Sequence, residues 1–236
     1  MASVTPILEQ QLLVGGFRLG VQLDQIAEVV TTQELDASAL GDTTVIKEPG
    51  AKGYGMSGEG FWLATQDDGV QGYHRARNVP VSLLLTDGSV GTFMRSFKSM
   101  VGGHEMLEGE WGGLARVGYT FGAMGAPVRG YVLSNSEETG NFTGSSVDLG
   151  AGPSGSQQVY AALHVFSGSG NLDVTIESDD NSGFTSATTR FTFAQVGTAV
   201  AQAYEWATPI SVGERYWRVN VTNPATRDLA VVLAIQ

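Results

Sequence analysis

The sequence contains no cysteine, so disulfide bonds and thiolate metal sites are excluded. Basic residues are scarce too: 13 Lys and Arg stand against 24 Asp and Glu, which gives a formal net charge of −11. Such a chain is poorly suited to wrap nucleic acid, because that binding neutralises phosphates with basic side chains. No apolar run approaches the roughly 18–20 residues that span a bilayer. The first residues, MASVTPILEQQLLVGG, lack the basic and long apolar regions of a signal peptide. We therefore expect a soluble protein made in the cytoplasm.

Residues suited to catalysis or metal binding are also few. The three histidines, none of which has a partner at a metal-ligand spacing, are His74, His104 and His164. The segment GYGMSGEG nearly forms a nucleophile elbow around Ser57, but Glu59 replaces the required final glycine. The acidic stretch 173–183 lacks the ligand series of an EF-hand loop, so a hairpin connection explains residues 179–183 better. The sequence therefore predicts no enzyme, no metal and no cofactor.

What the chain does contain is glycine, 32 residues in all, and many short stretches in which apolar and polar residues alternate. This pattern predicts short strands joined by turns. The alternation is clearest over 172–177 and 217–222, and Asp87-Gly88 is a turn signal. The expected strands are 17–23, 25–31, 54–62, 79–86, 90–98, 114–123, 127–134, 147–149, 158–167, 172–177, 188–196, 201–207, 217–222 and 229–235.

The predicted fold class is all-β, with one or two short helices. A stretch rich in Ser and Gly divides the chain. We expect a β-sandwich or barrel over 1–135, a linker over 136–157, and an Ig-like or jelly-roll-like β-sandwich over 158–236. One helix candidate lies within 63–77. The other is the N-terminal segment from Thr5 to Leu12, where a short helix and an extended arm are both open.

The stretch between the apolar runs at 26–30 and 60–63 shows no sustained period and contains one proline and several glycines. We expect a long loop there. Ordering it costs roughly 1–2 kcal/mol per residue, which its few apolar groups cannot offset alone. Contact with a neighbouring subunit could order it, and a disordered surface loop is the alternative. The residues assigned to this inter-subunit contact are Thr31, Leu35, Leu40, Asp42, Val45, Ile46, Lys47, Pro49 and Lys52.

The same stretch contains VTT at 30–32, GD at 41–42, PG at 49–50 and SGEGF at 57–61, in that order. Downstream follow PVSLLL, SFKSMVGGHEMLEGEW and LARVGYTFGAMGAPVRGYVL. This order resembles the major tail tube proteins of siphophages, and the C-terminal part resembles the β-sandwich appended to some of them. The resemblance covers nearly the whole chain and rests on the order of the motifs.

The resemblance implies a non-enzymatic virion protein of the tail, made in the host cytoplasm. It implies hexameric rings that stack into a tail tube, a conduit through which DNA passes without specific binding. Other tail proteins, such as tape measure and terminator proteins, are the implied partners. Acidic side chains would line the lumen and repel phosphates. The candidates for this lining are Asp24, Glu28, Glu59, Asp67 and Asp68.

Aromatic residues near the C-terminus offer a different function. Tyr204, Trp206 and Tyr216 are candidates to stack on sugars of cell-surface glycans, as in carbohydrate-binding sandwiches. Core packing is the other explanation and the favoured one for these aromatics, because Trp217 in the same group has alternating apolar neighbours. The alternative function is therefore a carbohydrate-binding protein or another virion decoration or adhesion protein.

Overall fold

The computed structural model describes residues 10–19, 23–36, 47–107, 114–150, 152–153, 157–222 and 225–236. The predicted all-β class is confirmed: strands make up 61% of the chain, and the described residues include one helix. The helix is α1 (Ala64–Gly72). The strands are β1 (Gln11–Val14), β2 (Phe17–Arg18), β3 (Leu23–Asp36), β4 (Lys47–Phe61), β5 (Val79–Leu84), β6 (Phe93–Leu107), β7 (Arg116–Ala123), β8 (Val128–Glu138), β9 (Phe142–Thr143), β10 (Val147–Asp148), β11 (Val159–Ser169), β12 (Asp173–Asp179), β13 (Thr188–Thr192), β14 (Ala203–Trp206), β15 (Tyr216–Thr222) and β16 (Thr226–Ile235).

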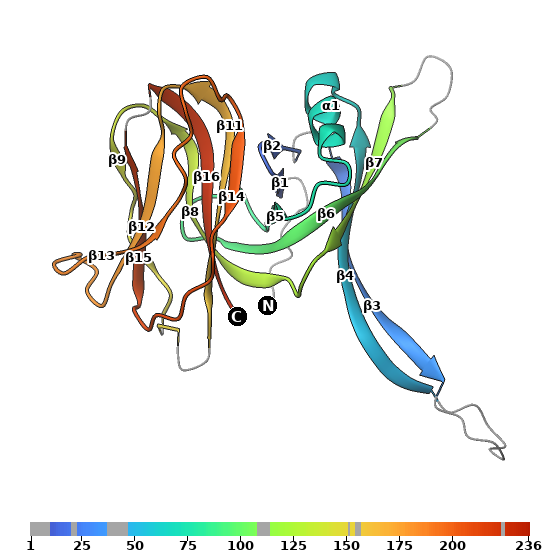
Figure 1. Cartoon of the computed structure of the whole chain (residues 1–236), viewed down its shortest axis with the longest axis horizontal. Helices are drawn as coiled ribbons and strands as arrows, with labels where there is room; N and C mark the ends of the chain where they lie inside the picture. The colour runs from blue at the N-terminus through green and yellow to red at the C-terminus, as the bar shows by residue number, and fades with distance from the viewer. Residues whose placement is uncertain are drawn as a thin grey trace, which may run out of the picture.

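The strands form two sheets in which every pairing is antiparallel. The larger sheet follows the order β14-β11-β16-β8-β6-β5-β1-β2, and β7, β4 and β3 branch from β6. The smaller sheet has the order β10-β15-β12-β13, with β9 also paired to β15. The smaller sheet packs beside β8, β11 and β16, whereas α1, β1 and β5 lie against β4, β6 and β7 (Figure 1).

Strand β16 shows how these layers are built. Leu229, Val231 and Leu233 are buried in the core shared with the smaller sheet, which we call the sandwich core. Ala230 and Val232 point the other way, into a second core that we call the middle core. A strand covered on both faces has a continuous apolar sequence, as TRDLAVVLAI does after its first residues.

The middle core draws on both halves of the chain. Leu13, Leu84 and Met94 come from the N-terminal half, and Ala162 and Val232 come from the C-terminal half. A third core, the N-terminal core, lies between β1, β5, β6 and the strands β4 and β7, under α1. One sheet therefore carries three cores, and strands of both halves share the central one.

The predicted boundary after residue 135 falls inside β8, which pairs with β6 on one side and with β16 on the other. The segment 136–157, expected to be a linker, contributes the end of β8 together with β9 and β10. The short strand expected at 147–149 is found as β10. Strand pairing thus continues through the region where we expected the chain to divide.

The helix expected within 63–77 is found as α1. At the N-terminus, Thr5 and Pro6 lie outside the described residues, but a helix reaching Leu12 is wrong because Gln11–Val14 is strand β1. Leu12 and Val14 are buried in the N-terminal core and Leu13 in the middle core. The run of apolar residues therefore reflects a strand with two buried faces.

The expected long loop is largely a β-hairpin. β3 and β4 pair from Leu23 and Gly60 out to Asp36 and Lys47. Beyond Gly55, β4 no longer pairs with β7, so residues 30–36 and 47–54 form a two-stranded arm that projects from the body (Figure 1). Thr31 and Lys52 are exposed. The sequence of this arm shows no sustained apolar period, which is why the pattern did not predict the strand pair.

One buried cation stabilises the end of the sandwich. Arg227 has no exposed surface, and its guanidinium donates to the carbonyl oxygens of four loop residues. These residues are Gly170, Gly197, Val200 and Ala201. Burial away from water lowers the pKa of Arg227. In the described part of the chain, no helix is long and apolar enough to cross a membrane.

Candidate assembly surface

The strands β3, β4, β7 and β6 form one four-stranded unit, which we call the arm sheet. Within the described residues, β3 pairs only with β4, so its other edge is free. Residues 100–107 of β6 pair only with β7, because β5 and β8 bind β6 further down, at residues 93–99. The arm sheet therefore has an edge on each side that pairs with no described strand, although the carbonyl of Val101 on the β6 edge accepts the backbone N–H of Arg75. Unpaired edges expose backbone N–H and C=O groups that can pair with another chain.

The two faces of the arm sheet differ. One face carries Met56, Tyr119 and Phe121 into the N-terminal core. The opposite face is covered by none of the described elements (Figure 1). Small residues dominate this outer face, where the strand register places them in rows: Gly55 beside Gly122, Ser57 beside Thr120, and Gly103 beside Thr120.

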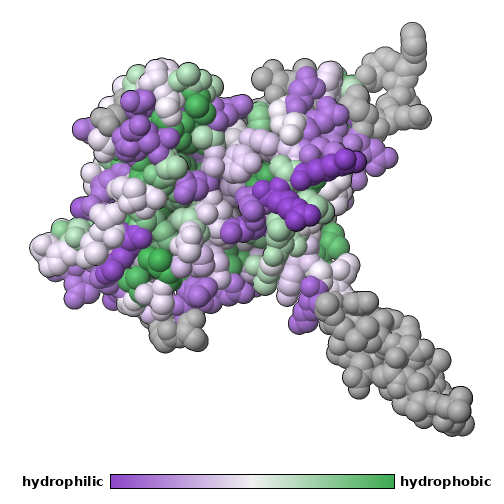
Figure 2. Space-filling view, viewed as in Figure 1, coloured by the Kyte–Doolittle hydropathy of each residue, from purple (hydrophilic) through white to green (hydrophobic). Residues whose placement is uncertain are grey.

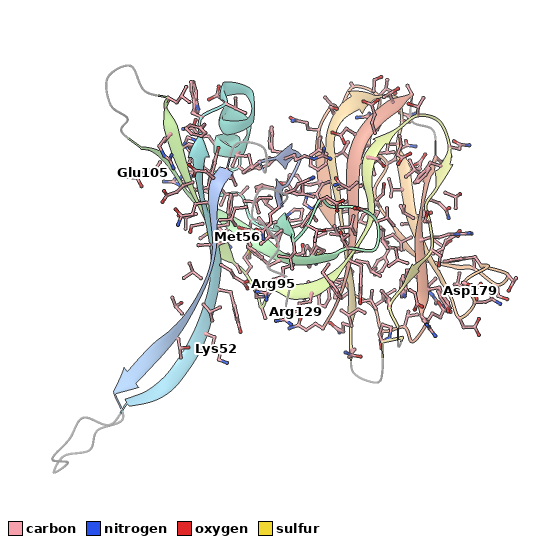
Figure 3. The ribbon with its side chains drawn as sticks, turned by 180° about the vertical axis from the view of Figure 1, so that it is seen from behind. Lys52, Met56, Arg95, Glu105, Arg129 and Asp179 are labelled. Atoms are coloured by element: carbon pink, nitrogen blue, oxygen red, sulfur yellow. The ribbon has the colours of Figure 1, made fainter. Side chains whose placement is uncertain are left out.

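Two carboxylates stand out on this smooth outer face. Glu59 of β4 and Glu105 of β6 both lie opposite Gly118 of β7, and both are exposed. Glu105 is labelled in Figure 3, near the upper end of β6. Glu59 was predicted from the sequence and Glu105 was not, because only the register of β4, β7 and β6 brings the two into one row.

Apolar side chains accompany both free edges. Val29 and Val30 on β3 are 44% and 56% exposed, and Met100 on β6 is 44% exposed. Val29 lies in one row with Gly55, Gly122 and Met100, so the two edges carry apolar residues at the same level. Elsewhere, on the described part of the face in Figure 2, hydrophobic patches are separated by hydrophilic residues.

The residues assigned to the inter-subunit contact fall into three groups. Thr31 and Lys52 are exposed on the arm. Leu35, Lys47 and Pro49 lie in β3 and β4, where Leu35 pairs with Glu48 and Pro49 with Glu34. The remaining four lie outside the described residues: Leu40, Asp42, Val45 and Ile46. The inter-subunit contact itself stays a prediction.

The five candidate lumen acids do not form one group. Asp24 binds Arg116 through two hydrogen bonds, of 2.9 and 3.0 Å, and Glu28 forms an ion pair with Arg95. These two carboxylates already have a cation. Glu59 faces the open side of the arm sheet, whereas Asp67 and Asp68 lie on α1, and of these two only the exposed side chain of Asp68 is described.

The three candidate sugar-binding aromatics are not brought together. Tyr204 and Trp206 are on β14 of the larger sheet, and Tyr216 is on β15 of the smaller one. Tyr204 packs edge-on against Tyr73, with ring centroids 5.2 Å apart. Trp217 is completely buried in the sandwich core, as core packing predicts. These residues therefore form no common platform for a glycan.

Residues with catalytic potential are likewise separate. Ser57 lies in the middle of β4, paired with Ala27 and Thr120, and not at a strand-to-helix turn. No group of three or more His, Asp or Glu side chains within the described residues could hold a metal ion. Asp179 accepts backbone N–H groups of Asn181 and Ser186, and these bonds lower its pKa. The acidic stretch is a hairpin connection, as predicted.

His164 is a titratable ring with no exposed surface. Its Nδ1 donates to the carbonyl of Gly15 at 2.8 Å, and its Nε2 lies 2.9 Å from the hydroxyl of Ser82, which also contacts Ser96. Burial lowers the pKa of His164 to about 4, and the positive charge of Arg18 acts in the same direction. The ring is therefore neutral at pH 7 and joins β11 to β5 and the β1–β2 turn inside the fold.

No protein-family model matches the sequence, and no curated protein matches it. Two solved structures are similar over part of the chain. One is a chain from the virion of a native gene transfer agent particle, with a TM-score of 0.35 and 16% identity, covering 49% of this chain and 92% of that one. The other belongs to the PVC sheath–tube complex of an extracellular contractile injection system in its extended state, with a TM-score of 0.40 and 9% identity, covering 56% and 95%.

Proposed function

We propose that this chain is a structural subunit whose arm sheets join edge to edge into a closed ring. The observation that carries the proposal is the pair of free edges on opposite sides of one four-stranded sheet. Strand direction alternates across the arm sheet, so β3 and β6 run in opposite directions. Rotation about an axis parallel to the strands would set β3 of one copy antiparallel to β6 of the next.

Such a contact joins two different surfaces, and repeating it around an axis closes a ring without leaving an edge exposed. Val29 and Met100 share a row within each copy, so a joint with little vertical offset brings them together. Burial of these exposed side chains would favour association, at about 25 cal/mol per Å² of apolar surface.

More specifically, we propose that the chain is the subunit of a virion tail tube. Six copies would form each ring, with the outer face of the arm sheet turned to the lumen. The small residues there leave a smooth wall, and Glu59 and Glu105 would repel DNA phosphates, so that DNA passes without binding. The arm would reach the neighbouring ring, because an isolated two-stranded hairpin is at best marginally stable in water.

Electron microscopy of the purified full-length chain tests the ring. Wild type should form rings or tubes. Val30→Lys places a charge at the β3 edge and should leave a folded monomer, whereas Val90→Lys, at an exposed valine outside the arm sheet, should assemble normally. A wild-type protein that stays monomeric at high concentration would refute the proposal.

A shortened arm tests stacking separately. Replacing residues 32–52 by Asn-Gly keeps Thr31 opposite Gly53 and supplies a preferred two-residue hairpin turn. This variant should form single rings that do not stack. Tubes of normal length from it would show that the arm has no role in stacking.

A further inference from the structure

Four side chains form a square on one face of the larger sheet. Arg95 of β6 lies directly opposite Arg129 of β8, and Phe93 lies directly opposite Tyr131 in the same pair of strands. Residues two apart on a strand share a face, so the arginine pair and the aromatic pair adjoin. Figure 3 labels Arg95 and Arg129 side by side below the curved sheet, near the base of the arm.

The arginine pair is unfavourable within a single copy. Like charges directly opposite each other across two strands destabilise a sheet. Glu28 compensates Arg95 through an ion pair. Arg129 is exposed and forms no ion pair with any described residue. Among the described residues, the two arginines therefore share a single carboxylate partner, in a chain whose net charge is −11.

The square forms the floor of a groove of about 520 Å³, which we call the arginine groove. Phe93 is 60% exposed, and its ring centroid is 5.0 Å from that of Tyr131. Leu85, which packs on the N-terminal core, and Ile235, which packs on the sandwich core, also line the groove. The groove thus lies on the sheet between the edge of the N-terminal core and the edge of the sandwich core. Exposed aromatic rings beside arginines are typical of the residues that dominate binding energy in protein interfaces.

We propose that the arginine groove binds a carboxylate-bearing segment of a second copy of this chain. The proposal rests on the proposed self-assembly. Arginine binds carboxylates in a fixed two-pronged geometry, and Arg95 already holds one such group, Glu28 of β3. β3 itself contains four acidic residues and no basic one, and two of the four, Asp24 and Glu28, already pair with arginines of their own copy. Every additional copy therefore offers the charge that Arg129 lacks, whereas nucleic acid would meet the repulsion of the whole acidic particle.

Charge reversal at Arg129 is the first test. Arg129→Glu should raise the protein concentration needed for assembly by tenfold or more, since hot-spot residues commonly change affinity by that factor. The matched control is Arg77→Glu, another exposed arginine, on the turn after α1, which should change this concentration less than twofold. Arg129→Gln should also weaken assembly while leaving the melting temperature of the monomer unchanged or higher, because it removes the repulsion by Arg95. A merely structural arginine would lower that temperature.

Cross-linking identifies the occupant. A photo-reactive phenylalanine analogue at position 93 should form cross-links in assemblies made from equal amounts of ¹⁴N- and ¹⁵N-labelled protein. Cross-linked peptides of mixed label prove a contact between copies, and we expect them to contain Asp or Glu. Cross-links only within one copy, or no cross-link at all, would overturn the proposal.

The two proposals fail in different ways. If wild type does not assemble, the proposed function fails and this inference fails with it. If wild type and Arg129→Glu assemble at the same concentration, only the inference fails, and the joint between β3 and β6 stands.

Discussion

The sandwich and the arm sheet are built from the same kind of element but with opposite surroundings. In the sandwich, β16 buries both faces, and its neighbours β8 and β11 complete the hydrogen bonding on both edges. In the arm sheet, one face and both outer edges lack any described cover. Strand β16 thus has both faces covered and both edges paired within one copy, whereas the outer strands of the arm sheet leave hydrogen-bonding groups and apolar side chains exposed.

The amino-acid content follows this difference. After Thr226, Arg227 and Asp228, β16 consists only of Leu, Val, Ala and Ile, because both of its faces are covered. The outer face of the arm sheet carries glycine, serine and threonine, with charge only at a few positions. Substitutions should therefore damage folding in the first region and association in the second.

The largest expected contrast is between two tryptophans. Trp217 is fully buried in the sandwich core, whereas Trp62, just after the arm sheet, is 38% exposed. Trp217→Ala should lower the free energy of unfolding by about 3–5 kcal/mol, since it removes a large buried ring and leaves a cavity. Trp62→Ala should lower it by less than about 1 kcal/mol. Urea denaturation measures both, and equal losses would show that the two regions are not packed differently.

Acid should weaken the contact that His164 makes between β11, β5 and the β1–β2 turn. The folded protein holds the pKa of His164 at about 4, below its value near 6.5 in an unfolded chain. The contribution of neutral His164 to the free energy of unfolding is fully present above pH 6.5. It is lost as the pH falls toward 4, because the unfolded chain binds the proton at a higher pH than the folded protein does. The loss amounts to about 3 kcal/mol over this range. His164→Asn should show a smaller difference in stability between pH 7 and pH 4, and an unchanged difference would contradict the assignment.

Substitution of two glycines compares a closely packed position in β8 with an open position in the arm sheet. A Cβ at Gly130 of β8 would lie 1.8 Å from the carbonyl oxygen of Leu233, so the backbone must shift. A Cβ at Gly122 of the arm sheet would meet nothing closer than the carbonyl oxygen of Met100, at 3.8 Å. Gly130→Ala should cost about 2 kcal/mol, and Gly122→Ala should change stability by less than about 0.5 kcal/mol. Thermal unfolding of the two variants compares them directly.

The smallest effect on stability is expected at the two outer glutamates. Glu59→Gln and Glu105→Gln should each leave the unfolding free energy within about 0.5 kcal/mol of wild type, since both side chains are exposed. The double variant should still assemble, but the assemblies should retain more DNA at low salt, because the wall has lost negative charge. Retention equal to wild type would show that these carboxylates do not face the lumen.

Much of the fold was predictable because many strands have a covered face. The alternation in YWRVNVT predicted β15, and the apolar run at 229–235 predicted β16. The outer part of the hairpin was missed because residues 31–36 and 47–53 show no sustained apolar period. The shared middle core was missed because alternation reveals that Leu13 has a buried face but not which strands lie opposite it.

The candidate site was less predictable, since it depends on register. Glu59 could be named from the sequence, but its pairing with Glu105 across Gly118 could not. The same holds for Arg95 and Arg129, which are 34 residues apart (129 minus 95) and meet only because β6 and β8 pair at those positions. Such long-range pairings are set by the whole fold and leave no local trace.

The salt bridge between Arg18 and Asp228 joins positions 210 residues apart, and β16 seals a core begun by β1. Folds dominated by distant contacts form slowly, because loop-closure entropy must be overcome before those contacts form. During synthesis, strands of the early part would wait, open to misfolding, until β16 has been made. The yield of folded protein should therefore depend on temperature and on chaperones that protect the early strands during this interval.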